Sequence, residues 1–151
     1  SERFMKRFKY PPFMTLVGLM LQGFLSIYLP IFTFNHIPIF FSITLIFFGI
    51  GSIFYLLNIF KQNKTAIQPD GEPERLLTQG IYNYSRNPIY LSMTIILTGS
   101  AMLHHSLSSY FIPLIFILLV KNIWIDYEEH KLKKIFGQEY LDYKNEVRRW
   151  I

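Results

Sequence analysis

Residues 76–90 combine the side chains that can bind a charged or polar ligand. They read LLTQGIYNYSRNPIY, with three tyrosines and with Arg86 and Asn87 directly before Pro88. Gly80 gives the backbone freedom, and the proline is suited to a first helical position. Residues of these types can form a binding site, and they can equally anchor a membrane span at the bilayer interface.

A second group of chemically capable residues follows the next apolar stretch. Asp126, Glu128 and Glu129 come directly after it, at a depth where acids are costly, so they require a cationic or hydroxylated partner. His130 lies four residues after Asp126, a spacing that favours a helix-surface pair. We expect no metal site, and the chain has no cysteine to supply a thiolate ligand or nucleophile.

Apolar residues recur at steps of three or four beyond these acids. This pattern predicts a helical segment with one packing face, interrupted near Gly137. Three lysines on the segment are expected to face water or anionic headgroups: Lys131, Lys133 and Lys134. The apolar face comprises Leu132, Phe136, Tyr140, Tyr143, Val147 and Trp150.

The elements that must position these groups follow from the distribution of charge. All charged side chains lie in residues 2–9, 61–86 and 121–149, which leaves residues 10–60 and 87–120 without an ionised group. A charge at the centre of a bilayer costs roughly 3 kcal/mol or more. The sequence therefore predicts an integral membrane protein.

We expect an all-α membrane bundle of about four transmembrane helices, followed by a cytoplasmic helical segment. A span requires about 20 apolar residues, so the first uncharged stretch divides at Asn35–Pro38 and the second at His104–Ser109. The predicted spans are residues 13–34, 38–60, 88–103 and 109–125. Four glycines could let helices approach closely, or could reflect the frequency of glycine in membrane helices: Gly18, Gly23, Gly49 and Gly51.

Four spans place both termini and the middle charged group on one side of the membrane. These regions hold all 15 Lys and Arg residues, so the positive-inside rule predicts that they are cytoplasmic. The net charge of +5 does not indicate nucleic-acid binding, because the basic residues flank apolar spans and are mixed with acids. We expect membrane lipids as partners; the sequence does not determine the oligomeric state.

Together these segments resemble the isoprenylcysteine carboxyl methyltransferases and the related phospholipid methyltransferases, over roughly residues 75–149. In those families a Leu-Val-Thr-x-Gly-x-Tyr segment runs into Arg-His-Pro-x-Tyr, and after a span come Glu-Glu and Phe-Gly-x-Glu-Tyr-x-x-Tyr. The matching segments here are LLTQGIY at 76–82, RNPIY at 86–90, EE at 128–129 and FGQEYLDY at 136–143. The resemblance implies one membrane methyltransferase domain over residues 1–151, with S-adenosylmethionine as cofactor.

The resemblance also implies a cofactor site at the cytoplasmic face, with a lipophilic substrate entering from the bilayer. Arginine and asparagine donors suit the cofactor's carboxylate, the glutamates suit its ammonium and ribose, and tyrosine faces suit its sulfonium. Backbone groups near the two leucines would hold the adenine. The implied cofactor contacts are Leu76, Leu77, Tyr82, Arg86, Asn87, Tyr90, Glu128 and Glu129.

Glu129 and Arg86 are the candidate catalytic residues. A carboxylate substrate would need only positioning and exclusion of water, whereas a lipid amine would need a proton acceptor, for which Glu129 is the nearest candidate. Asn87 stands where many relatives have histidine, and Glu146 where relatives often have a basic residue, so neither of those family groups carries over. The candidate substrate contacts are Tyr140, Tyr143 and Arg148.

Two other functions stay open at this point. Membrane sterol and steroid reductases share a similar Arg-x-Pro-x-Tyr segment and use NADPH, and a small four-helix membrane protein could bind a partner or lipid without catalysis. Binding of S-adenosylmethionine against NADPH separates the three. The sequence does not choose among a prenylcysteine carboxylate, a phospholipid amine and a small thiol as substrate.

Overall fold

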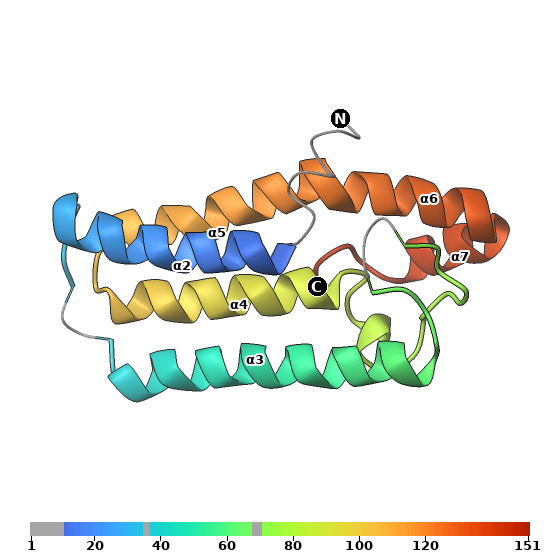
Figure 1. Ribbon diagram of the computed structural model, residues 1–151, viewed down its shortest axis with the longest axis horizontal. Helices are drawn as coiled ribbons and strands as arrows, with labels where there is room; N and C mark the ends of the chain where they lie inside the picture. Colours follow the sequence, from blue (N-terminus) through green and yellow to red (C-terminus); the bar gives the residue numbers. More distant parts are fainter. Residues whose placement is uncertain (1–10, 35–36, 68–70) are drawn as a thin grey trace.

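The computed structural model describes residues 11–34, 37–67 and 71–151, and its elements are helices that run mostly along one long axis (Figure 1). In chain order they are α2 Pro11–Tyr28, α3 Ile39–Gln62, the 3-10 helix η1 Gly80–Asn83, α4 Pro88–Leu103, α5 Leu107–Val120, the π-helical segment η2 Lys121–Ile125, α6 Asp126–Phe136 and α7 Gln138–Glu146.

The helices have the lengths and compositions of a membrane bundle, as the sequence predicted. Three are long and apolar enough to span a bilayer: α2, α3 and the continuous helix Leu107–Phe136; α4 is apolar but has only 16 residues. The predicted bounds of α4 are confirmed, and those of α3 are correct to within two residues. Asn35 and His36, predicted to form the first turn, lie outside the described residues.

Two predicted span boundaries were wrong. The first span was expected to reach residue 34, but α2 ends at Tyr28 because Pro30 disfavours helical backbone at the residue before it. The last span was expected to end at residue 125, but the helix continues through η2 into α6. Pro113 lies within the helix, but no glycine or proline occurs between it and Gly137, so the acids after the apolar part stay on the same helix.

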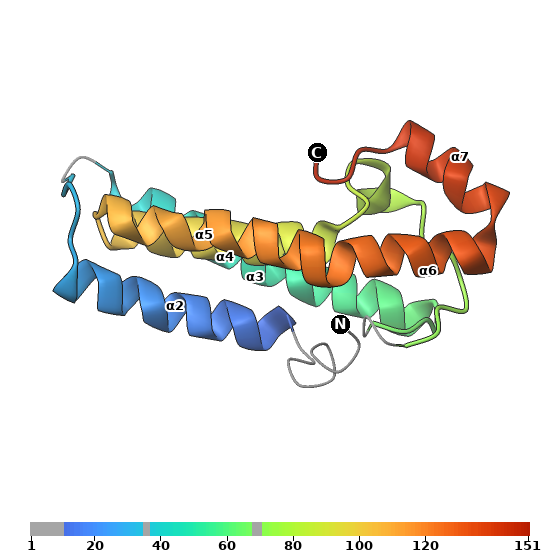
Figure 2. The ribbon, with the colours of Figure 1, turned by 90° about the horizontal axis from the view of Figure 1, so that it is seen from above.

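Gly137 ends α6 and begins α7, as expected from the interrupted apolar pattern. Its φ of 53° lies in the region that favours glycine. Figure 2 shows α7 turned back from the end of α6, beside the segment that contains η1. We call this end of the molecule, where η1, α6 and α7 lie, the site end.

Helices α3 and α4 pack closely through two glycines. A Cβ atom on Gly49 would lie 2.6 Å from Ile96 Cγ1 and 2.9 Å from the Ser92 carbonyl oxygen, and one on Gly99 would lie 3.0 Å from the Ser42 carbonyl oxygen. Small residues permit this approach between membrane helices. Of the glycines considered from sequence, Gly51 faces open space.

Candidate functional site

A cavity of about 440 Å³ lies at the site end, and most of its wall is apolar. Pro11 and Pro12 of α2 and Ile53 and Leu57 of α3 form part of that wall. The wall also contains ten of the eleven residues singled out from sequence: Leu76, Leu77, Tyr82, Arg86, Asn87, Tyr90, Glu128, Glu129, Tyr140 and Tyr143.

The segment before α4 and the acids of α6 meet across this cavity. The Tyr90 hydroxyl donates a 2.7 Å hydrogen bond to Glu128 Oε1. One turn earlier in the chain, Arg86 Nη1 lies 2.9 Å from Glu129 Oε1. The two segments predicted to form one site are therefore in direct contact.

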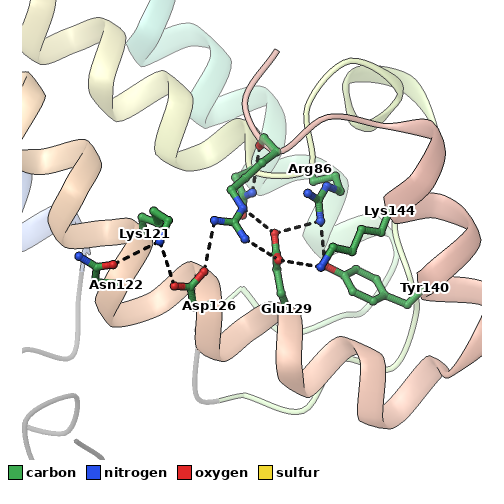
Figure 3. Close-up of polar contacts among 9 residues, drawn as sticks. Arg86, Lys121, Asn122, Asp126, Glu129, Tyr140 and Lys144 are labelled. Atoms are coloured by element: carbon green, nitrogen blue, oxygen red, sulfur yellow. Dashed lines mark hydrogen bonds and ion pairs between the residues drawn. The ribbon is translucent and has the colours of Figure 1, made fainter.

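Glu129 is the centre of an ion-pair cluster (Figure 3). Besides the contact with Arg86, it accepts a bidentate pair of hydrogen bonds from Arg149, from Nε to Oε1 at 2.9 Å and from Nη2 to Oε2 at 2.8 Å. Lys144 Nζ lies 3.4 Å from the second carboxylate oxygen. The Glu129 side chain is only 10% exposed, so three cations on different segments compensate one buried charge.

Arg86 has one donor to spare. Its Nη1 contacts Glu129 and donates to the Tyr140 hydroxyl at 3.2 Å. Its Nε is buried, in a side chain that is only 9% exposed, and has no hydrogen-bond partner within the described part of the chain. An unpaired buried donor is costly, and its place in the cavity wall suits an anionic ligand.

The C-terminal segment fastens the residues before α4. The Arg86 N–H donates to the Arg148 carbonyl at 3.1 Å, and Asn87 Nδ2 donates to the Arg149 carbonyl at 3.0 Å. This backbone is extended at Val147, so successive side chains alternate in direction. Val147 is buried, whereas Arg148 is exposed and absent from the cavity wall.

Neither arginine lines the cavity, but Arg149, and not Arg148, contacts the cavity residue Glu129. The pKa of Arg149 is raised above the ordinary value, mainly by its hydrogen bonds to Glu129. It also lies 3.3 Å from Asp126. The sequence showed that a basic residue was available near the chain end, but the register of the extended segment decides which of the two neighbours is used.

The tyrosines of the site are held as neutral hydroxyl groups. Burial raises the pKa of Tyr82, Tyr140 and Tyr143 above the ordinary value of 10.0. The Tyr143 hydroxyl donates a 2.7 Å hydrogen bond to the Tyr82 carbonyl, which ties α7 to η1. These side chains can donate hydrogen bonds and present aromatic faces, but they are poor proton acceptors.

Lys131 was expected to face water or headgroups, and this was wrong. It lines the cavity, and its Nζ donates to the Gly71 carbonyl at 2.5 Å. Its position three residues after Glu128 places both on one helix face, a spacing that could have revealed it. Within residues 11–34, 37–67 and 71–151, no group of three or more His, Cys, Asp or Glu residues could hold a metal ion.

Comparisons with known proteins identify relatives of this chain. The family model of phospholipid methyltransferases matches residues 16–139. Protein-S-isoprenylcysteine O-methyltransferase B of Arabidopsis thaliana is 34% identical over 80 residues, which cover 50% of this chain and 39% of that enzyme. The chain thus spans about two fifths of the plant protein. An uncharacterized protein of Haemophilus influenzae is 36% identical over 63 residues, 42% of this chain and 100% of that protein.

Proposed function

Because the chain belongs to the phospholipid methyltransferase family, we propose that it is an integral-membrane methyltransferase that uses S-adenosylmethionine and acts on a lipophilic substrate. The observation that carries this proposal is the cavity wall in which Arg86 meets Glu129 and Tyr90 meets Glu128. The family match does not favour the reductase alternative.

The residues of the cavity fit S-adenosylmethionine. The volume of about 440 Å³ is within the range of about 300–1,000 Å³ for small-molecule sites. The buried, unpartnered Nε of Arg86 provides a donor for the ligand's carboxylate. When bound, the cofactor supplies an electrophilic methyl group on a sulfonium.

Each part of the wall then has a binding role. Arg86 and Asn87 hold the carboxylate, and Glu129 takes the ammonium or ribose hydroxyls, aided by the cations that fix its orientation. Leu76 and Leu77 lie beside the adenine. Tyr82, kept neutral by burial, presents its ring to the cationic ligand.

The apolar wall serves the substrate. Ile53 and Leu57 of α3 line the cavity, while the outward faces of α2 and α3 expose large apolar side chains to the lipid, among them Phe24 and Phe54. A lipophilic substrate therefore approaches from the bilayer along α3. We place both termini and the site end in the cytoplasm, because every Lys and Arg lies on that side of the four spans.

Cofactor binding to the detergent-purified protein tests the proposal. We expect S-adenosylmethionine to bind the wild type, and Arg86→Ala and Glu129→Gln to bind it at least 30-fold more weakly, because each removes a charged partner in the cavity. Lys134→Ala and Glu146→Gln are matched controls, since both side chains are exposed and outside the cavity. Isothermal titration with S-adenosylmethionine and, in parallel, NADPH gives the affinities.

A methyl-transfer screen then identifies the acceptor, with isotope-labelled S-adenosylmethionine, lipid extracts and mass spectrometry of the products. Affinities unchanged in both cavity variants would overturn the site, and NADPH binding in preference to S-adenosylmethionine would overturn the proposed activity.

A further inference from the structure

Asn87 occupies a position where its side chain would ordinarily cap a helix. It directly precedes the first turn of α4, and an asparagine there usually accepts a hydrogen bond from a backbone N–H of that turn. Here its side chain forms no such bond. The residue is only 8% exposed, so its amide needs another partner within the protein.

That partner is the extended backbone that follows α7. Asn87 Nδ2 donates to the Arg149 carbonyl at 3.0 Å, and the Arg86 N–H donates to the Arg148 carbonyl at 3.1 Å. The Ser85 hydroxyl donates to the Arg149 carbonyl at 3.5 Å and accepts from the Asn87 N–H at 3.2 Å. Three successive residues before α4 are therefore joined to two successive carbonyls, without the use of a charged group.

Apolar side chains hold this extended backbone at both ends. Val147 is buried in the cluster that contains Tyr82, at the site end. Trp150 packs against the core cluster that contains Tyr90. We call residues 147–150 the clasp. Because its two ends pack in different clusters, the clasp ties the residues before α4 to both the site end and the bundle.

Arg86 lies between the residues that the clasp holds. Its own N–H and the amide of the next residue are bonded to the clasp, while its Nε is unpaired within the described part of the chain and the residue lines the cavity. We propose that Asn87 is a positioning residue, which acts through the Arg149 carbonyl to hold Arg86 with its guanidinium towards the cofactor's carboxylate. This inference rests on the proposed function and gives Asn87 an indirect role in place of direct contact with that carboxylate.

The chemistry of the two side chains favours this division of roles. A carbonyl oxygen only accepts, and a neutral amide can donate to it without bringing a charge into a buried position. The guanidinium of Arg86 suits the anionic ligand better, because charge-assisted hydrogen bonds are the stronger ones. Without the Asn87 amide, the Arg149 carbonyl loses the closer of its two donors, which favours release of the clasp.

Amide hydrogen exchange tests the clasp without any ligand. The Arg86 N–H is protected while it donates to the Arg148 carbonyl. We expect Asn87→Leu, a side chain of similar shape without a donor, to speed its exchange about tenfold, the effect of one lost hydrogen bond. Asn83→Leu makes the same change at an exposed position outside the cavity wall and keeps the wild-type rate. Mass spectrometry of a peptide that spans Arg86 gives the rates.

A double-mutant cycle on cofactor affinity separates positioning from direct contact. We expect Asn87→Leu and Trp150→Ala each to weaken S-adenosylmethionine binding about tenfold. The double variant then binds within about threefold of the weaker single variant, because residues that act through the same clasp are not additive. A direct contact of Asn87 with the cofactor would add the two losses, to about 100-fold.

Isothermal titration measures the wild type and the three variants, and thermal unfolding in detergent shows that each is folded. Asn87→Ala, which also lacks the donor, and Val147→Ala, at the other end of the clasp, replace a variant that does not unfold cooperatively.

Three results overturn the inference while the proposed function stands: Asn87→Leu exchanges the Arg86 N–H at the wild-type rate, or it binds S-adenosylmethionine as tightly as the wild type, or its loss adds to that of Trp150→Ala. A wild type that binds no S-adenosylmethionine overturns both.

Discussion

Buried polar side chains occur in two regions of the molecule, and they are bonded differently in each. In the bundle interior, formed by α2, α3, α4 and α5, several short hydroxyls bond to carbonyls of their own helix, such as Ser92 to Pro88 and Thr94 to Tyr90, both at 2.8 Å. Gln22 and Ser109 instead bond to carbonyls of neighbouring helices. At the site end, long charged and aromatic side chains bond to one another across separate elements, as Arg86 does to Glu129.

The difference shows that polarity in a membrane bundle does not by itself mark a site. A serine or threonine whose hydroxyl donates to a carbonyl in the preceding turn of its own helix needs no other partner, so the helices can pack closely around it. The side chains of the site end instead depend on partners from other elements, surround a cavity and leave a buried Arg86 donor unpaired. An unpaired donor on a residue that lines a cavity, as on Arg86, is what a ligand can bind.

A substitution in the close-packed α3–α4 contact gives the largest expected effect and asks whether the bundle interior serves for packing. Gly49→Leu places its side chain against Ile96 and the Ser92 carbonyl, so we expect it to lower the free energy of unfolding by at least about 1–3 kcal/mol, the typical cost of overpacking. Gly51→Leu, which faces open space two residues away, serves as the control. Thermal unfolding in mild detergent measures both; equal midpoints would refute the close contact.

The helical bundle could be predicted from sequence because its cause is local: charge-free stretches and the cost of charge in a bilayer. The bounds of α4 followed from Pro88 and the polar residues after Leu103. The continuation of the last span into α6 was missed, because the charged residues that suggested an end do not break a helix. Only the backbone shows that Asp126 and Glu129 stay on it.

The residues of the site were predicted less completely, because only the polar and charged ones stand out in the sequence. Glu128 and Tyr90 could be singled out because a charge or hydroxyl beside an apolar span needs a reason. Ile53 and Leu57, which form the apolar wall, resemble every other lipid-facing residue of the first two spans. Their role depends on packing, which no local pattern encodes.

The choice between neighbouring arginines sharpens the comparison at the site end. Arg149→Ala removes the two-pronged contact with Glu129 and the pair with Asp126, so we expect about tenfold weaker S-adenosylmethionine binding. Arg148→Ala removes an exposed side chain and keeps the carbonyl that accepts from Arg86, so its loss is smaller. Titration of both variants decides; an equal or larger loss for Arg148 would contradict the observed register.

Replacing a buried polar residue of the bundle interior gives the smallest expected effect. It tests whether polar groups there serve only the packing of the helices. Gln22 is fully buried, donates to the Leu97 carbonyl at 2.8 Å and the Ser109 carbonyl at 3.2 Å, and leaves its own Oε1 without a partner in the described residues. Hydrogen bonds between membrane helices average about 0.6 kcal/mol, and Gln22→Leu also removes the unpaired oxygen. We therefore expect thermal unfolding in detergent to shift little and cofactor affinity to stay at the wild-type value. Gln22 does not line the cavity. A strong loss of affinity for S-adenosylmethionine in this variant would therefore mean that polar groups of the bundle interior also contribute to ligand binding.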